Sequence, residues 1–288
     1  MSKKNPVIIC AALTGATTMK NNNPSVPYTV PEYVEEAYRC QSSGAAMIHI
    51  HARTDEGEST HEIDRVRAIY EAVKDRCPDL IICLSSAVGI HKTPEQRLAQ
   101  IVAVRPDMAS YNTNSMNFSL IDRNNGQILF DYLFDNTFTM LQDFGRAMES
   151  NGVKPEIECY DLGGIDNTML IAKQGFFSKP MNFNFVWGVS GGQRFRPEVM
   201  VAMKNALPPN SNFTACGVSI EQFPAVTMSC LLGGHMRVGL EDNTRMPNGE
   251  LAKGSYEQVE WAVGVARALN REPASAAEAR EIMGIRKG

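Results

Sequence analysis

Residues 47–51 read Met-Ile-His-Ile-His and place two histidines, His49 and His51, one residue apart within an apolar run. In an extended strand, residues two positions apart point to the same face, so both imidazoles share one face while Ile48 and Ile50 share the other. Neighbouring imidazoles repel when protonated and leave donors unmatched when neutral, so a shared divalent cation is an economical explanation. A hydrogen-bonded structural pair without a metal is the alternative.

Charged residues near the C-terminus have the chemistry to complete such a site. Residues 236–240 are predicted to form a strand that carries Arg237 and is followed by Glu241 and Asp242. Catalytic zinc commonly takes histidine nitrogens and a carboxylate and leaves one position open, so Glu241 or Asp242 would be the third ligand. Adjacent residues tend to point in different directions, which frees the other carboxylate for proton chemistry. Arg237 would keep Asp242 ionised as a base.

Two further carboxylates, Glu156 and Glu158, lie two residues apart and therefore share a strand face. Buried carboxylates are uncommon and need partners, so Glu158, nearer the strand end, is expected to face the same site. A salt-bridged structural layer is the alternative for Glu156.

The elements that must position these residues follow a regular alternation. Eight short apolar segments, rich in β-branched residues, occupy residues 7–11, 46–50, 80–84, 108–111, 157–160, 183–187, 213–217 and 236–240. Segments with helical spacing follow them at residues 29–43, 63–75, 93–104, 138–151, 165–173, 196–206, 220–232 and 256–270. Continuous apolar strands alternating with helices indicate parallel pairing with both sheet faces covered, and eight such units predict a (β/α)8 TIM barrel. An open doubly wound sheet is the alternative, although no G-x-G-x-x-G follows the first segment.

Residues 114–136, between the fourth and fifth strands, are polar at the front and aromatic behind. We interpret them as an insertion over the barrel mouth or as an interface element. Residues 274–288 are predicted to contain a short extra helix. With no linker or further repeat, residues 1–288 are expected to form a single catalytic domain.

Composition excludes several classes of protein. Of the 288 residues, 43% are hydrophobic and 21% charged, which is typical of a folded globular chain. Its 28 basic and 32 acidic residues give a net charge of -4, so no general field attracts nucleic acid or an anionic membrane. No apolar run approaches the roughly 20 residues of a membrane span, and the beginning of the chain is a poor signal peptide. We therefore expect a cytoplasmic protein without nucleic-acid or membrane partners.

The remaining cysteines and histidines are predicted to be structural. No C-x-x-C pair occurs, so the seven cysteines are expected to be buried thiols rather than zinc ligands or disulfides. His61 and His91 are expected to be solvated, and His235, at the start of the last strand, to be a buried structural residue.

The segments around these residues, in their order, resemble the β-keto acid cleavage enzymes. The segments are TGATT, GAAMIHIHARTDEGE, ICLSSAVG, RPDMASYNTNSMNF, PEIECYD, FVWGVSGG and GGHMRVGLEDN, and the resemblance runs from about Val7 to Met283. It implies a zinc-dependent barrel with one Zn²⁺ per subunit that assembles as a homotetramer. It also implies condensation of a β-keto acid with the co-substrate acetyl-CoA to give acetoacetate and a new acyl-CoA.

The resemblance assigns roles to individual residues. It implies that the zinc ligands are His49, His51 and Glu241, and that Asp242 is the base with Arg237 as its partner. Ser85, Ser110 and Glu158 match the substrate-contacting serine, a hydroxyl of the fourth strand and the glutamate of the fifth strand. Thr17 and Asn112 are expected to be further substrate contacts, and the residues that bind CoA are not assigned.

One departure from the family bears on the substrate. The family member of lysine fermentation carries a glutamate after the first strand that suits its substrate's ammonium group, whereas Thr17 stands here. The loop after Ser85 is also two residues shorter than in that enzyme. We therefore expect a different β-keto acid, with a side-chain pocket around Thr17, Tyr111, Trp187 and Glu221.

Two other functions remain open from the residues alone. A zinc aldolase or hydrolase on the same barrel would use the same metal and base without acetyl-CoA. A metal-dependent sensor or structural oligomer is disfavoured, because hydroxyls, carboxylates and an arginine all gather at one end of the strands. The glycine-rich turn at residues 188–192 is either a backbone phosphate contact or a plain tight turn.

Overall fold

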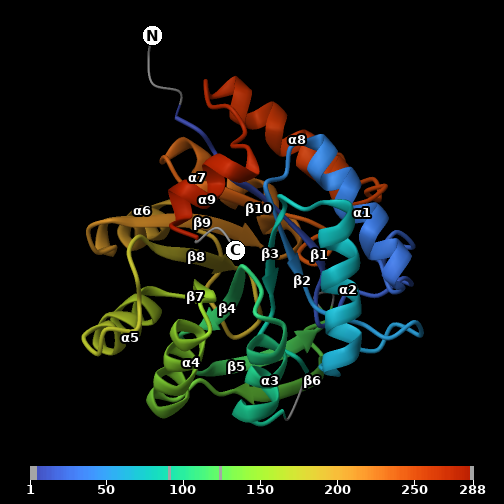
Figure 1. The fold of residues 1–288 in the computed structure, drawn as a ribbon. Coiled ribbons are helices and arrows are strands. Elements are labelled where there is room, and N and C mark those ends of the chain that lie inside the picture. Colours follow the sequence, from blue (N-terminus) through green and yellow to red (C-terminus); the bar gives the residue numbers. More distant parts are fainter. Residues whose placement is uncertain (1–4, 90–91, 123–124, 286–288) are drawn as a thin grey trace.

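The computed structural model describes residues 5–89, 92–122 and 125–285. Within them, eight parallel strands form a closed barrel (Figure 1). The strands are β1 (Ile9–Thr14), β2 (Met47–Ile50), β3 (Ile81–Leu84), β4 (Met108–Asn112), β7 (Lys154–Cys159), β8 (Met181–Trp187), β9 (Ser211–Gly217) and β10 (His235–Val238). They pair in the order β1-β10-β9-β8-β7-β4-β3-β2, with β2 closing on β1. The predicted TIM barrel is therefore confirmed, and the open sheet is excluded.

Helices follow the strands and form the outer layer (Figure 1). They are α1 (Val30–Ser43), α2 (Ile63–Arg76), α3 (Pro94–Val104), α4 (Phe138–Ser150), α5 (Leu162–Ala172), α6 (Pro197–Ala206), α7 (Gln222–Leu231), α8 (Ser255–Ala268) and α9 (Ala276–Met283). A short 3₁₀ turn, Ser219–Glu221, precedes α7. Local sequence explains where α1 and α3 begin. Thr29 and Thr93 each form a capping box with the glutamate or glutamine three residues later, and a proline lies between the two residues of each box, in the first turn of the helix.

The first strand begins later than predicted. Val7 and Ile8 are apolar, but they precede the barrel strand, and Val7 makes an isolated bridge to Pro273. Strand β1 instead continues to Thr14. The predicted C-terminal helix is α9, whose buried Ala279 and Met283 pack against the N-terminal end of the barrel.

The insertion between the fourth and fifth barrel strands is an antiparallel hairpin of β5 (Met116–Ile121) and β6 (Ile128–Phe134). Phe118 pairs with Tyr132 across the two strands, so their rings share one face and contact each other. Residues of both strands line the cavity at the barrel mouth. This agrees with the first of the two interpretations of the segment.

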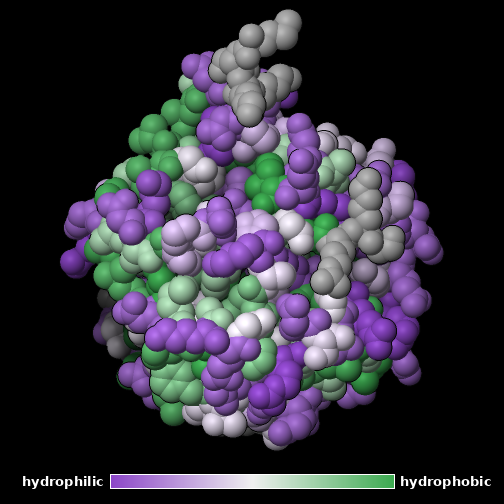
Figure 2. Space-filling model, turned by 60° about the vertical axis from the view of Figure 1, so that its left-hand side comes forward, coloured by the Kyte–Doolittle hydropathy of each residue, from purple (hydrophilic) through white to green (hydrophobic). Residues whose placement is uncertain are grey.

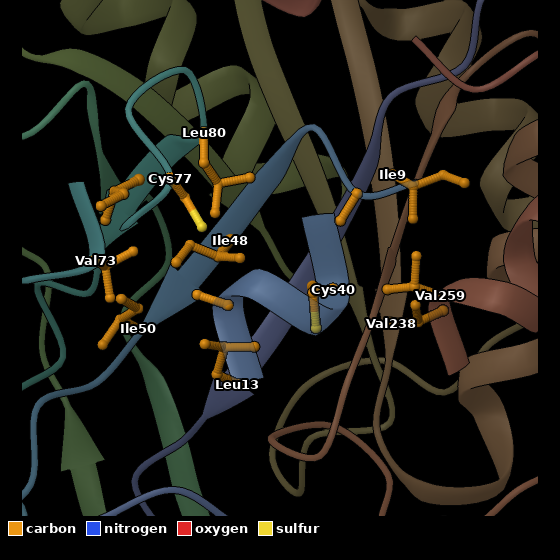
Figure 3. Packing of buried hydrophobic residues seen from close by; sticks show 14 of the residues in the cluster. Ile9, Leu13, Cys40, Ile48, Ile50, Val73, Cys77, Leu80, Val238 and Val259 are labelled. Atoms are coloured by element: carbon orange, nitrogen blue, oxygen red, sulfur yellow. The ribbon is translucent and has the colours of Figure 1, made fainter. Parts of the chain in front are cut away.

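The largest core lies between the strands and the helices (Figure 3). Ile48 and Ile50 of β2 join the apolar cluster that also contains Val73 of α2 and Cys40 of α1. Because side chains alternate along β2, His49 is left on the opposite, lumenal face. All seven cysteines are buried and free of disulfides, as expected.

On the surface, polar and apolar side chains intermingle over the face shown in Figure 2. Within the described residues, no helix combines the length and apolar character needed to span a lipid bilayer.

Candidate active site

A cavity of about 650 Å³ lies at the barrel mouth, where the carboxyl ends of the strands meet. Eight of the residues singled out in the sequence line it. They are Thr17, His49, His51, Ser85, Glu158, Arg237, Glu241 and Asp242. The barrel thus brings together residues that are more than two hundred positions apart in the chain.

Three of these side chains converge closely enough to bind one metal ion. One ligand atom from each of His49, His51 and Glu241 lies within 4.8 Å of the others. Nε2 of His49 is 3.7 Å from Oε2 of Glu241, and Nε2 of His51 is 3.4 Å from Oε1. Oε2 of Glu241 is buried and has no hydrogen-bond partner among the described residues. Two imidazole nitrogens beside such an oxygen fit a zinc ion well.

The protonation state of His49 suits a metal ligand. Burial, reinforced by the positive charge of Arg237, lowers the pKa of His49, so its imidazole is neutral near pH 7. Only a neutral imidazole has the lone pair that a metal requires. On the other side of the ring, Nδ1 lies 3.5 Å from Oε2 of Glu156. Glu156 is also 3.3 Å from Sγ of Cys83, so this carboxylate lies deeper in the barrel than the cavity.

The chain after β10 turns sharply and carries Glu241 to the histidines. Gly239 has φ of +154°, and a Cβ there would lie 2.0 Å from the carbonyl oxygen of Ala12 in β1. The turn therefore requires glycine at this position. Strand β1 lies between β10 and β2, which is the separation of two strands expected from barrel closure. This turn makes Glu241, rather than Asp242, the carboxylate beside the two histidines.

Arg237 is buried and binds three carboxylates. Its Nε and Nη2 donate to the two carboxylate oxygens of Asp242 at 3.0 and 3.1 Å. Nη2 also donates to Oε1 of Glu241 at 2.6 Å, and Nη1 donates to Oε1 of Glu158 at 3.3 Å. The bidentate contact fixes the plane of the Asp242 carboxylate.

The pKa values of the three carboxylates differ. Burial favours the neutral form of Glu241, but the charge of Arg237 foremost, with His51 beside the carboxylate, holds the pKa of Glu241 far below its usual range. Burial raises the pKa of Asp242 to about 6, because Arg237 offsets burial only in part. Arg237 lowers the pKa of Asp242 against the effect of burial, and with a pKa of about 6 the carboxylate is ionised near pH 7. Burial and the nearby Glu156 raise the pKa of Glu158 to about 8. Near pH 7 the guanidinium of Arg237 therefore contacts both a base, Asp242, and a neutral acid, Glu158.

Two of the expected substrate contacts, Ser110 and Asn112, lie behind the cavity wall. Oγ of Ser110 accepts from the backbone N–H of Ser86 at 2.8 Å. Oδ1 of Asn112 accepts from the hydroxyl of Tyr160 at 2.9 Å. Neither side chain lines the cavity, so direct contact with a substrate stays a prediction for both.

The predicted side-chain pocket is wrong for three of its four residues. Tyr111 points into the helix layer, where its hydroxyl donates to the carbonyl of Leu141 at 2.8 Å. Trp187 packs edge-on against Phe195 on the same outer side of the barrel. Glu221 accepts from Nε of Arg194 and is a structural residue. Of the four, Thr17 alone lines the cavity.

Sequence reasoning missed the aromatic wall of the site. The hairpin contributes Phe118, Phe130, Tyr132 and Phe134, and the loop before α3 contributes Lys92. The alternating pattern of LFDYLF in residues 129–134 is the signal that would have placed Phe130, Tyr132 and Phe134 on one face.

The histidines outside the site differ in their positions. His61 is half-buried, and His91 lies outside the described residues. His235 is buried at the other end of the barrel, where its Nδ1 accepts from the backbone N–H of Ile8 at 3.1 Å, as a structural residue should.

Comparison with known proteins identifies the family of this chain. Residues 6–285 match the model of the family described as beta-keto acid cleavage enzyme. The chain belongs to the β-keto acid cleavage enzyme family. The 3-keto-5-aminohexanoate cleavage enzyme of Acetoanaerobium sticklandii is 41% identical over 281 residues, which cover 98% of this chain and 99% of that protein. The 3-oxoadipate:acetyl-CoA acetyltransferase of Cupriavidus necator is 30% identical, covering 97% and 95% of the two chains.

Solved structures support the fold of this family member. The apo structure of ObcA superposes with a TM-score of 0.73 at 22% sequence identity. The match covers 91% of this chain and 66% of that longer one. At this identity the similarity establishes the shared barrel and nothing about the reaction.

Proposed function

We propose that this β-keto acid cleavage enzyme is zinc-dependent and exchanges acyl groups between a 3-oxo carboxylic acid and acetyl-CoA, releasing acetoacetate and a new acyl-CoA. The observation that carries the proposal is the convergence of His49, His51 and Glu241 beside the Arg237–Asp242 pair in one cavity. The names of relatives that act with acetyl-CoA support the second substrate.

Atom balance defines what the protein must do. Acetoacetate keeps the CH₂COO⁻ group of the keto acid, so the bond between C2 and C3 breaks and C2 becomes bonded to the acetyl carbonyl carbon. CoA leaves the acetyl group and joins the acyl group that ends at C3. The enzyme must therefore remove a proton from C2, hold the carboxylate and admit the thioester.

The residues of the cavity match these tasks. Zinc held by His49, His51 and Glu241 would act as a Lewis acid on the keto oxygen. Asp242, with a pKa of about 6, accepts the proton from C2 while Arg237 holds its carboxylate plane. Oγ of Ser85 accepts from a backbone N–H at 3.1 Å, which leaves its hydroxyl hydrogen to donate to the substrate carboxylate.

The charges of the cavity restrict the keto acid. In the described part of the chain, the acidic residues that line the cavity are Glu158, Glu241 and Asp242, and all three bind Arg237. Thr17 is uncharged and Lys92 adds a positive charge. A substrate ammonium would find no free carboxylate, whereas the aromatic hairpin would accept an apolar group. We therefore infer a keto acid other than a 5-amino-3-oxo acid.

The decisive experiment is a mass-spectrometric screen of purified protein with acetyl-CoA and β-keto acids bearing anionic, neutral and cationic side chains, with and without a chelator. Acetoacetate and a new acyl-CoA, both lost with chelator, are expected. Cleavage without acetyl-CoA would instead establish the zinc aldolase or hydrolase. No product from any acid would refute the acyl exchange.

Two variants separate metal binding from proton transfer. Glu241→Gln should lose both zinc and turnover, because it removes an anionic ligand. Asp242→Asn should keep zinc and lose at least about 100-fold in kcat, since the base is gone. Zinc content by elemental analysis and kcat on the same preparations check both. Full turnover by metal-free Glu241→Gln would refute the mechanism.

A third variant tests the substrate. Thr17→Glu places a carboxylate at the cavity wall and should shift the kcat/KM preference toward a keto acid with an ammonium side chain by about 10-fold or more. Thr17→Gln, of similar size but uncharged, is the matched control and should not shift it. An equal shift in both variants would show that size, and not charge, decides.

We further infer a homotetramer that acts in the cytoplasm. Exposed Leu129 and Leu133, on the outer face of the hairpin, support association with another copy. Light scattering of the purified protein tests the assembly.

A further inference from the structure

Arg53, two residues after His51, is buried among backbone carbonyls. Only 1% of its surface is exposed. Its Nη2 donates to the carbonyl oxygens of Gly15 and Thr18, the latter at 2.8 Å, and its Nη1 donates to that of Gly57. Among the described residues, no carboxylate forms an ion pair with Arg53. Burial without a counter-ion is costly, so the three carbonyl contacts, together with Sδ of Met19 at 2.8 Å from Nη1 and the ring of Tyr28, stabilise this cation.

The loop that Arg53 binds, residues 15–18, forms one side of the active site. Gly15, Ala16 and Thr17 line the cavity. The same loop contacts the metal ligand Glu241. A Cβ on Gly15 would lie 2.5 Å from Cγ and 3.1 Å from Cδ of Glu241, so the glycine backbone packs directly against that side chain. The hydroxyl of Thr18 donates to the carbonyl oxygen of Glu241 at 3.0 Å.

We propose that Arg53 is a positioning residue that fixes the loop at residues 15–18 and, through it, the carboxylate of Glu241 and the cavity wall at Thr17. Because Arg53 follows His49, near the end of β2, and His51, just after β2, it ties the backbone beside two ligands to the loop that supports the third. The proposal rests on the metal site proposed above. It adds a residue that touches neither the metal ligands' donor atoms nor the cavity.

The chain contains a matched control at the other end of the barrel. Arg271 is also buried, and it donates to the carbonyl oxygens of Asn5, Pro6, Cys230 and Gly234. It likewise forms no ion pair among the described residues. Arg271 contacts no residue of the loop at 15–18, so it shares the chemistry of Arg53 without the connection to Glu241.

The test compares zinc affinity in Arg53→Met and Arg271→Met, measured by competition with a chromophoric chelator, together with the thermal midpoint of each variant. We expect Arg53→Met to bind zinc at least about 10-fold more weakly, as removal of a supporting contact around a metal site typically does. Arg271→Met should lose thermal stability and bind zinc within about twofold of wild type. Arg53→Lys should not restore affinity, because one ammonium cannot span three carbonyls in the fixed geometry of a guanidinium.

Two milder variants cover the case in which Arg53→Met does not fold. Thr18→Val removes the donor to the Glu241 carbonyl, and Gly15→Ala forces the Glu241 side chain to move; both should weaken zinc binding. Unchanged affinity in Arg53→Met or in both loop variants, or equal loss in Arg271→Met, overturns the positioning role. A wild-type protein that binds no zinc would instead refute the proposed metal site itself.

Discussion

Replacing His235 by asparagine should make the protein lose less stability in acid. His235 is buried where β10 meets the chain before β1, and its Nδ1 accepts from the backbone N–H of Ile8. Asparagine keeps an acceptor, since its Oδ1 can take the place of Nδ1, but it does not titrate. The variant therefore keeps the hydrogen bond and removes the proton-binding group.

The magnitude follows from the pKa of the imidazole. Burial, and then the charge of Arg271, lowers the pKa of His235 to about 3, against about 6.5 in an unfolded chain. Below about pH 6.5 the unfolded chain takes up a proton that the folded chain does not bind until about pH 3. Stability present above about pH 6.5 is therefore lost across this window. At about pH 5 the loss amounts to roughly 2 kcal/mol at about 1.4 kcal/mol per pH unit.

Urea unfolding of wild type and His235→Asn, followed by circular dichroism at about pH 7 and about pH 5, measures this effect. Any fixed cost of the substitution appears at both pH values and cancels in the difference. The stability gap between the two proteins should change by about 2 kcal/mol in favour of the variant at the lower pH. A gap that stays constant would show that His235 titrates normally or is not buried. Turnover at about pH 7 should be unchanged, because His235 does not line the active-site cavity.

Two predictions concern residues remote from the chemistry. Tyr111→Phe should lower the free energy of unfolding by about 1 kcal/mol, because it removes the donor to the Leu141 carbonyl. The ratio of kcat/KM values among the keto acids of the panel should not change, which steady-state kinetics would check. Asp107→Asn should lower the free energy of unfolding by about 3 kcal/mol near pH 7, because Asp107 binds Lys74 and Arg280. The hydrogen bonds from Lys74 and Arg280 outweigh burial and lower the pKa of Asp107, so its contribution to stability is present above about pH 4 and is lost as the pH falls further. Denaturation at several pH values should therefore show that the stability difference between the variant and wild type shrinks in acid.

The part of the site that could be predicted depends on local periodicity. His49 and His51 were placed in the lumen, with Ile48 and Ile50 against the helices, because alternation along a strand is a property of the strand itself. The same rule, applied to β4, would have excluded Tyr111 from the pocket. Residues 110 and 112 face the lumen, so residue 111 points outward.

Other features depend on contacts between distant segments. The sequence could not decide between Glu241 and Asp242 as a ligand, because the turn at Gly239 is dictated by the Ala12 carbonyl of the neighbouring strand. Arg53 gave no signal of its own, since its partners are backbone carbonyls, which every residue possesses. Contacts of this kind can be identified only from the folded barrel, which brings the distant segments together.

The electrostatics of the cavity floor give an argument for the metal that is independent of any resemblance. Glu158, Glu241 and Asp242 share one guanidinium, that of Arg237, while Oε2 of Glu156 lies 3.5 Å from Nδ1 of His49. The buried carboxylates of this cluster therefore outnumber the guanidinium that binds them. Uncompensated buried charge is costly, and a cation beside Oε2 of Glu241 would offset it. A divalent cation offsets more of this excess than a monovalent one, so the surplus of carboxylates favours a divalent ion.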